Sequence, residues 1–320
     1  MTKIGLLVGK ENTFPDAFID RVNSKRVEGV TAEFVRLHGG TRTDERIPYS
    51  VILDRISHEV CYYRAYCKKA VADGCTVINN PFWWSADDKF FECVLAQDLG
   101  VAIPRTIVLP SSEFPPDISR EESLRNIVYP MPWEDMLDYT GSPAVLKPAI
   151  GGGNKNISIV HSVQELEEAY GRSNQLLMIL QEKIEFENYV RCYCVGQNNV
   201  LISRYDHSLP HAERYVDGFE GIDEELRERI IRDVLTLNRA LGYDMNTVEF
   251  AIRDRIPVAI DFLNPAPDSD RASIGPDRFE WVVEHLANFA IECALKRPES
   301  QSEFRWSSMI NPVISAAVSG

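Results

Sequence analysis

Short apolar runs and amphipathic segments alternate along the first 80 residues of the chain. The apolar runs are typical of buried strands and the segments between them have helical spacing. This alternation predicts a small open α/β unit with a parallel sheet. No GxGxxG follows its first strand, so the pattern does not favour dinucleotide binding. We expect strands at 3–9, 31–37, 51–56 and 76–79, and helices at 15–22 and 59–72.

The pattern changes beyond residue 84. A helix is predicted over 85–99, with Ser85 as its N-cap and Gly100 ending it. Residues 110–143 are rich in proline, serine and acids, which indicates a surface excursion with one short helix at 121–127. The rest predicts strands at 106–109, 144–147, 157–160, 176–181, 189–195, 200–205, 247–252 and 258–262, and helices at 163–170, 224–241 and about 277–296.

Charge and composition exclude several classes of function. The 320 residues carry a formal net charge of −14, which repels nucleic-acid phosphate and anionic lipid. We therefore expect neither nucleic acid nor membrane as a partner, and no apolar stretch approaches bilayer length. The seven cysteines contain no CxxC pair, which favours reduced thiols in a cytoplasmic protein. A small anionic ligand would need its own cationic pocket.

One such pocket is indicated around Lys147. This lysine ends an apolar strand, where a half-buried charge needs a partner. The glycine run Gly151, Gly152, Gly153 follows it, and backbone N–H groups of such a run can approach an anion without interference from a Cβ. Asn154 adds a polar side chain. The segment is no Walker A loop, and a mobile hairpin loop is an equally good interpretation of these residues alone.

Two carboxylates interrupt a second apolar hairpin. Glu249 and Asp261 each lie among apolar neighbours on one of its strands, and Asn264 follows three residues later. A buried acid is costly unless it is paired or metal-bound. Carboxylates with an amide oxygen form a hard-oxygen set suited to Mg²⁺, with Mn²⁺ as a substitute. The alternative is two acids on the solvent face of an antiparallel ribbon.

The order of these segments carries more information than any one of them. The segments follow one another in this order: a helix with Lys89, the Lys147 strand with its glycine loop, the segment MILQEKI at 178–184 that ends a strand, a strand with Arg191, and the acidic hairpin. This order resembles the ATP-grasp superfamily of D-alanine–D-alanine ligase and glutathione synthetase, over roughly residues 76–292. The resemblance implies a mixed α/β and α+β fold. An N-terminal open parallel α/β unit would be followed along the chain by a two-subdomain ATP-grasp fold, in which ATP lies between two antiparallel sheets.

The resemblance also implies residue roles. Lys89, Lys147 and the loop Gly151–Asn154 would contact ATP phosphates. Glu182, Lys183 and Ile184 would bind adenine, and Glu187 would bind the ribose. Arg191 would lie near the transferred phosphate, and Arg204 could neutralise an acyl phosphate, with a sheet-surface arginine as its alternative. The magnesium ligands would be Glu249, Asp261 and Asn264.

This sequence departs from the family pattern at the metal set. The family often has Asp at position 249 and Glu at position 261, so the two side-chain lengths are exchanged here. The usual acid-x-Asn also has one extra residue, giving Asp261-Phe-Leu-Asn264. A shifted register would bring Asp268 into the site in place of Asn264.

The resemblance predicts an ADP-forming ligase that activates a carboxylate as an acyl phosphate for attack by an amine or thiol. Amino acids or peptides are the expected substrates and a homodimer is a possible assembly. A kinase-type phosphotransferase and a non-catalytic nucleotide-binding protein are the alternatives. Asp54-Arg55 suggests either a substrate-carboxylate contact or a structural ion pair. We expect a first domain at 1–84, an ATP-grasp domain at 85–297 (subdomains about 105–185 and 186–297) and a tail at 298–320.

Overall fold

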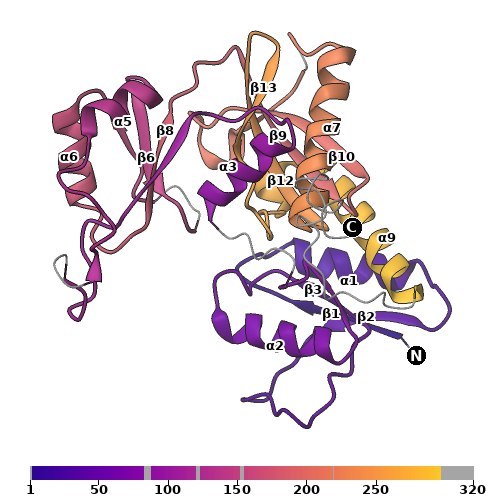
Figure 1. The fold of residues 1–320 in the computed structure, drawn as a ribbon. Coiled ribbons are helices and arrows are strands. Elements are labelled where there is room, and N and C mark those ends of the chain that lie inside the picture. The colour runs from indigo at the N-terminus through magenta and orange to yellow at the C-terminus, as the bar shows by residue number, and fades with distance from the viewer. Residues whose placement is uncertain (1, 83–87, 120–122, 152–154, 219, 297–320) are drawn as a thin grey trace, which may run out of the picture.

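The chain is described by a computed structural model that covers residues 2–82, 88–119, 123–151, 155–218 and 220–296. Gly152, Gly153 and Asn154 of the loop expected to contact phosphates lie outside these ranges, as does the expected tail at 298–320. The described elements form three sheets (Figure 1).

The first unit is the predicted parallel sheet. Strands β1 (Thr2–Leu7), β2 (Val30–Phe34), β3 (Val51–Asp54) and β4 (Thr76–Ile78) lie in the order β2-β1-β3-β4, and every pair is parallel. Helix α1 (Phe14–Ser24) packs on one face through Phe14, Phe18 and Val22. Helix α2 (Cys61–Ala72) covers the other face. The mixed fold class expected from the sequence is confirmed here and in the two antiparallel sheets below.

A four-stranded antiparallel sheet follows, which we call the small sheet. Its order is β5 (Thr106–Leu109), β8 (Met178–Glu182), β6 (Ala144–Pro148) and β7 (Ser158–Val160). Leu146 and Leu180 face α5 (Trp133–Thr140) and α6 (Val163–Gly171) in a separate apolar core. Helix α5 was not predicted, because the prolines and acids around it resemble a surface connection.

The large sheet has five antiparallel strands: β11 (Tyr215–Val216), β10 (Asn199–Tyr205), β9 (Asn188–Val195), β12 (Met245–Arg253) and β13 (Ile256–Asp261). Helix α7 (Glu224–Leu241) covers one face, and its bounds match the prediction. Both ends are specified locally. The Asp223 side chain accepts a hydrogen bond from the Leu226 N–H, and Gly242 ends the helix at a φ of 76°.

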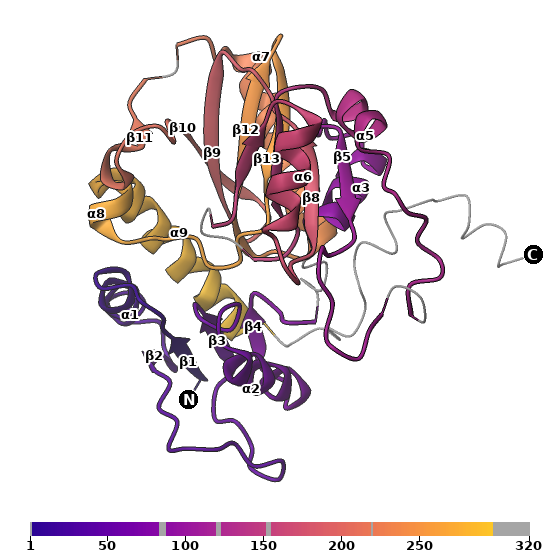
Figure 2. The same ribbon diagram turned by 90° about the vertical axis from the view of Figure 1, so that its left-hand side faces the viewer.

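Helix α9 (Pro276–Leu295) joins the first unit to the large sheet. Its apolar face shares one core with β1, with α1 and with Tyr193 and Val195 of β9. Figure 2 shows α9 between the large sheet and the first unit. The one-turn helix α8 (Arg271–Ile274) precedes it. Helix α3 (Lys89–Asp98) packs on the α7 side of the large sheet through Leu95 and Ala96 before the chain enters the small sheet.

Candidate functional site

Glu249 and Asp261 are partners in the ladder between β12 and β13. The register shifts between Glu249 and Phe250, so that Phe250 pairs with Ala259 while Glu249 pairs with Asp261. The residue between them, Ile260, is therefore the extra residue of a β-bulge. If the register did not shift, Glu249 would pair with Ile260 and not with Asp261. The bulge thus places both carboxylates on the same face of the large sheet.

The two acids differ in how their carboxylate oxygens are paired. Oδ1 of Asp261 is buried and has no hydrogen-bond partner among the described residues. Oε2 of Glu249 accepts a hydrogen bond from the Tyr189 hydroxyl at 2.6 Å, and its Oε1 lies 3.6 Å from Nε of Arg191. A buried carboxylate oxygen without a donor is costly unless something positive binds it. The carboxylate oxygens of Glu249 and Asp261 are ligands of the kind that a hard divalent cation such as Mg²⁺ prefers.

Asn264 is held beside the acids by a residue that the sequence did not single out. Asn246 is fully buried, and its Oδ1 accepts a hydrogen bond from the Asn264 backbone N–H at 3.0 Å. The Asn264 side-chain nitrogen donates to Oγ1 of Thr247 at 2.9 Å, which leaves its amide oxygen as the remaining acceptor. An uncharged polar residue in an apolar strand was the available signal for Asn246.

Asp268 has other partners. Its Oδ2 lies 3.7 Å from Nε2 of His211, and its Oδ1 accepts a hydrogen bond from the Asp270 backbone N–H. Oδ1 of Asp261, in contrast, is buried without a hydrogen-bond partner among the described residues. Asp261 belongs to both predicted metal sets, and the choice between Asn264 and Asp268 stays a prediction.

Lys147 extends from the small sheet to the strand that carries Asp261. Its Nζ donates to the Ile260 carbonyl oxygen at 3.4 Å, and its side chain is 8% exposed. Burial lowers the pKa of Lys147 below its ordinary 10.5, and the negative charge of Asp261 partly opposes that shift. A buried cation thus faces two carboxylates across the space between the sheets.

Lys89 fixes the start of the glycine run. Its Nζ donates to the Gly151 carbonyl oxygen at 2.7 Å, and its backbone N–H donates to the Ala149 carbonyl oxygen at 2.8 Å. Lys89 is buried at the first turn of α3, while Gly151 is exposed at a φ of 86°. The structure therefore brings Lys89, Lys147 and the beginning of this loop together.

Glu182 is already engaged by two arginines. Its carboxylate contacts Nε of Arg105 at 3.1 Å and Nη1 of Arg253 at 2.8 Å. Burial opposes its charge, but the hydrogen bonds from Arg253 and Arg105 outweigh that effect and lower the pKa of Glu182. Arg253 lies on β12, so this carboxylate links the small sheet to the large sheet.

The other residues expected to contact adenine and ribose differ in their surroundings. Ile184 is buried against Ala251 and Val258 of the large sheet, as an apolar slab requires. Lys183 pairs with Glu185, and Oε1 of the exposed Glu187 accepts a hydrogen bond from the Asp254 backbone N–H.

The two predicted arginines point in opposite directions. Arg191 pairs in the ladder with Glu249 on one side and Ser203 on the other, so these three side chains share one face. Burial opposes its charge, but nearby Tyr215 and Glu249 outweigh that effect and raise the pKa of Arg191. Arg204 is one residue beyond Ser203 and lies on the other face, where it contacts Glu220 at 2.6 Å. The structure does not bring Arg204 to the acids, because one residue along a strand reverses the side-chain direction.

Arg55 forms a structural ion pair, which was one of its two sequence interpretations. Its side chain is 1% exposed and binds both carboxylate oxygens of Glu11. It also donates to the Pro267 carbonyl oxygen and, at 3.3 Å, to Oγ of Ser269. Arg55 therefore joins the first unit to the loop after β13. Asp54 is taken up by its own turn through the Ser57 N–H and hydroxyl.

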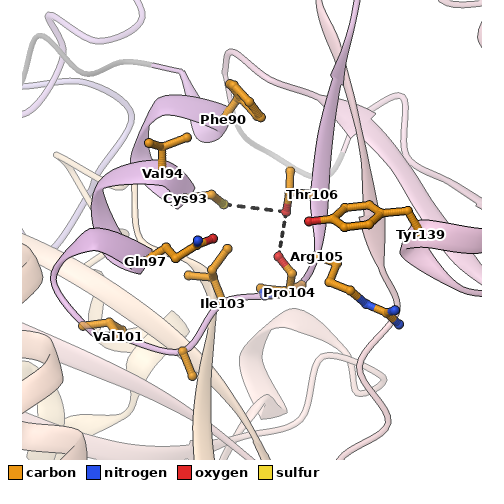
Figure 3. A pocket seen from close by; sticks show the side chains of 11 residues that line it. Phe90, Cys93, Val94, Gln97, Val101, Ile103, Pro104, Arg105, Thr106 and Tyr139 are labelled. Atoms are coloured by element: carbon orange, nitrogen blue, oxygen red, sulfur yellow. Dashed lines mark hydrogen bonds between the residues drawn. The ribbon is translucent and has the colours of Figure 1, made fainter. Parts of the chain in front are cut away.

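A cavity of about 300 Å³ lies at the β5 edge of the small sheet (Figure 3). Cys93 of α3 points toward Thr106 of β5 in this cavity, and their Sγ and Oγ1 atoms are 3.9 Å apart. Burial raises the pKa of Cys93 to about 11. None of the predicted site residues lines the cavity, so it adjoins the lysine and acid site without being part of it.

Solved structures resemble this arrangement over nearly the whole chain. The D-Ala:D-Ser ligase VanG of Enterococcus faecalis aligns with a TM-score of 0.63 at 14% identity, over 92% of this chain and 99% of that one. A RimK domain ATP-grasp protein of Sphaerobacter thermophilus gives 0.62 at 16% identity, over 91% and 100%. D-alanine–D-alanine ligase of Bacillus anthracis complexed with ATP gives 0.57 at 16% identity, over 92% and 97%. The chain has the ATP-grasp fold.

Comparison with curated proteins gives shorter matches. Pyruvate carboxylase 1 of Caenorhabditis elegans and the mitochondrial pyruvate carboxylase of Rattus norvegicus are each 28% identical over 127 residues. The match covers 35% of this chain, and the chain spans about a tenth (11%) of the length of these relatives. No protein-family model matches the chain.

Two features are absent from the described residues. None of the helices within these ranges is long and apolar enough to cross a membrane. No group of three or more His, Cys, Asp or Glu side chains there is arranged to hold a metal ion.

Proposed function

We propose that this protein is an ATP-dependent ligase that activates a carboxylate for attack by an amine or, less favourably, a thiol. One observation carries the proposal: the buried Lys147 ammonium of one sheet donates to the Ile260 carbonyl oxygen of the other, next to Asp261, whose charge acts on it and whose buried Oδ1 has no hydrogen-bond partner among the described residues. Triphosphate and Mg²⁺ together present the complementary charges, since phosphate oxygens satisfy the lysine and the cation satisfies the acids. The ATP-grasp fold and its resemblance to D-alanine–D-alanine ligase support this interpretation.

In the proposed site, Lys89, Lys147 and the loop from Gly151 to Asn154 bind phosphates. Glu249, Asp261 and Asn264 hold Mg²⁺ or Mn²⁺, which neutralises charge on the phosphates. The segment Glu182–Ile184 contacts adenine, with Ile184 as its apolar surface, and Glu187 contacts the ribose. Because the Glu182 carboxylate is held by two arginines, we assign the polar adenine contact to the backbone of this segment.

The proposed reaction has two steps. A substrate carboxylate oxygen forms a bond to the γ-phosphorus while the bond to the ADP oxygen breaks. The amine nitrogen then bonds to the acyl carbon, phosphate leaves, and the amine loses a proton to solvent. Arg191 supplies positive charge beside Glu249 during the first step. Positioning and charge neutralisation account for this catalysis without a covalent protein intermediate.

The wider assignments are proposals of the same kind. We place the first domain at 1–84 and the ATP-grasp domain at 85–297, with subdomains divided near residue 185 and a tail from 298. Amino acids or short peptides are the proposed substrates, in a cytoplasmic enzyme without nucleic-acid or membrane partners and with a homodimer as a candidate assembly. The kinase-type and non-catalytic alternatives differ in their products.

One experiment separates these functions. The full chain is incubated with ATP, Mg²⁺, a panel of carboxylic acids and hydroxylamine, which traps acyl phosphates as hydroxamates. A ligase forms ADP and hydroxamate together. A kinase forms ADP and a stable phosphorylated product without hydroxamate, and a non-catalytic protein binds ATP but forms no ADP. Either of the last two results would reject the ligase.

A further inference from the structure

Three arginines surround a pair of tyrosines at the β10 and β11 edge of the large sheet. The ring centroids of Tyr205 and Tyr215 are 5.1 Å apart. Arg191 lies over the Tyr205 ring at 5.3 Å and Arg278, from α9, over the Tyr215 ring at 5.2 Å. Arg214 completes the group. We call these five residues the arginine–tyrosine cluster.

The cluster is continuous with the proposed metal site. The Tyr205 hydroxyl accepts hydrogen bonds from Nη1 of Arg191 at 3.4 Å and from Nη1 of Arg214 at 3.5 Å. Ser203, which shares the face of Arg191 and Glu249, accepts a hydrogen bond from Nε of Arg278 at 3.1 Å. Positively charged side chains therefore extend along one face of the sheet, from Arg191 beside Glu249 to Arg278 on α9.

These charges are poorly neutralised. Within the described ranges Arg214 forms no ion pair, and its Nε donates to the Leu209 carbonyl oxygen. The only acid paired with Arg278 there is Asp217 at 3.4 Å, and the Asp217 side chain is fully exposed to screening water. Arg191 would lose Glu249 to a bound cation. In a chain with a net charge of −14, three such arginines in one place form a local positive site that is suited to an anion.

We propose that the cluster binds a second anionic group on the activated carboxylic acid, so that the substrate is a short diacid. This rests on the proposed ligase function. The reactive carboxylate would lie at Arg191 beside the metal ligands, and the second group at Arg214 and Arg278. The tyrosine rings between the two ends would contact the carbon chain. A dicarboxylate and a phosphorylated carboxylic acid offer the same chemistry, and the test separates them.

The test compares acids that differ only in the second group. Glutamate, glutarate and phosphoserine are compared with the monocarboxylates norvaline and valerate, with ATP, Mg²⁺ and hydroxylamine in the assay. Binding of each acid is also measured by calorimetry in the presence of a non-hydrolysable ATP analogue, so that turnover is not required. We expect a diacid to bind, and to react, about tenfold or more better than its monoacid counterpart, as one charge-assisted hydrogen bond predicts.

Variants assign the effect to the cluster. Arg278→Gln and Arg214→Gln should each raise the diacid KM about tenfold, and leave the ATP KM and the monoacid KM unchanged. Arg278→Lys should recover part of the loss because it retains the charge, which a merely structural role would not require. Arg42→Gln is the matched control, since Arg42 is exposed and pairs only with Asp44 among the described residues.

Equal affinity for diacids and monoacids, or an unchanged diacid KM in both glutamine variants, would overturn the proposal. Diacid binding that depends on Arg278 but yields no ADP would keep the binding site and reject the ligase function. A preference for phosphoserine over glutamate would identify the second group as phosphate.

Discussion

Glu249 and Asp261 face each other across a ladder only because β13 contains one extra residue at Ile260. The bulge corrects the direction of the second acid, since a one-residue slip in a strand moves a side chain to the other face. The irregularity is therefore part of how the site is built. A regular ladder continued from the Phe250 and Ala259 pair would place Ile260 opposite Glu249 and turn the Asp261 side chain to the other face.

The unpaired oxygen of Asp261 predicts that this acid is essential for metal-dependent turnover. Asp261→Asn keeps the shape but removes the charge, and we expect kcat to fall about 100-fold or more. Asp268→Asn is the control, and should change kcat less than about threefold because its carboxylate contacts the Asp270 N–H and His211 instead of the two acids. Steady-state ADP release at varied Mg²⁺ measures both. A larger loss in Asp268→Asn would move the metal site to Asp268.

Tyr189 predicts a separable effect on metal affinity. Its hydroxyl orients Glu249 without touching the ligand in our assignment, so Tyr189→Phe should raise the Mg²⁺ concentration for half-maximal activity about 10- to 100-fold. The kcat at saturating Mg²⁺ should remain near that of the unmodified protein. Tyr62→Phe, in the first unit, is the control. An unchanged Mg²⁺ dependence would show that this hydrogen bond does not position a metal ligand.

Lys147 predicts a conflict between binding and stability. Because burial lowers its pKa in the folded chain, the unfolded chain binds more protons between that pKa and 10.5, and stability rises with pH there. Lys147→Met removes the buried charge at similar volume. Its Tm should exceed that of the unmodified protein by a few degrees at neutral pH, and this gain should vanish as pH approaches 10.5.

ATP affinity should move in the opposite direction in the same variant. Losing the ammonium should weaken ATP binding about tenfold or more, measured by calorimetry. Unchanged ATP affinity would reject the assignment of Lys147 to the phosphates. A lower Tm at neutral pH would show that the lysine stabilises the fold instead.

Arg55 predicts a large structural effect far from the proposed chemistry. Breaking a buried ion pair leaves one charge without its partner, which costs about 3–5 kcal/mol, and Arg55→Ala should destabilise the chain by that order. Glu11→Gln should cost nearly as much, because Arg55 then stays buried and charged. Thermal unfolding of both variants checks this. A loss below about 1 kcal/mol would mean that water reaches the pair.

The sequence predicted most elements because their local signals agree with their surroundings. Helix α7 has a capping Asp223, a regular apolar stripe and Gly242 at its end, and its bounds were correct. Short or tertiary elements were missed: α5 forms against the small sheet, and β11 has two residues that pair only with β10. Such elements depend on contacts that no local window contains.

The same distinction applies to the candidate site. Lys147, Glu249 and Asp261 stood out because charges within apolar strands are costly, and the structure brings them together. Arg204 was expected either to neutralise an acyl phosphate or to lie on the sheet surface, and the strand register places it on the face opposite Arg191. Asn246, Tyr189 and the arginine–tyrosine cluster depend on which strands are neighbours, and that information appears only with the fold.

The apolar cores connect the three sheets unequally. The first unit and the large sheet share a core through α9, whereas the core of the small sheet contains only its own residues and its helices. The chain enters the small sheet before Thr106 and leaves it after Glu182, and polar contacts such as Arg253 to Glu182 bridge the remainder. The apolar contact described between the two sides is the small cluster of Ile184 with Ala251 and Val258. Separating the small sheet from the large sheet would therefore cost far less apolar burial than separating the large sheet from the first unit.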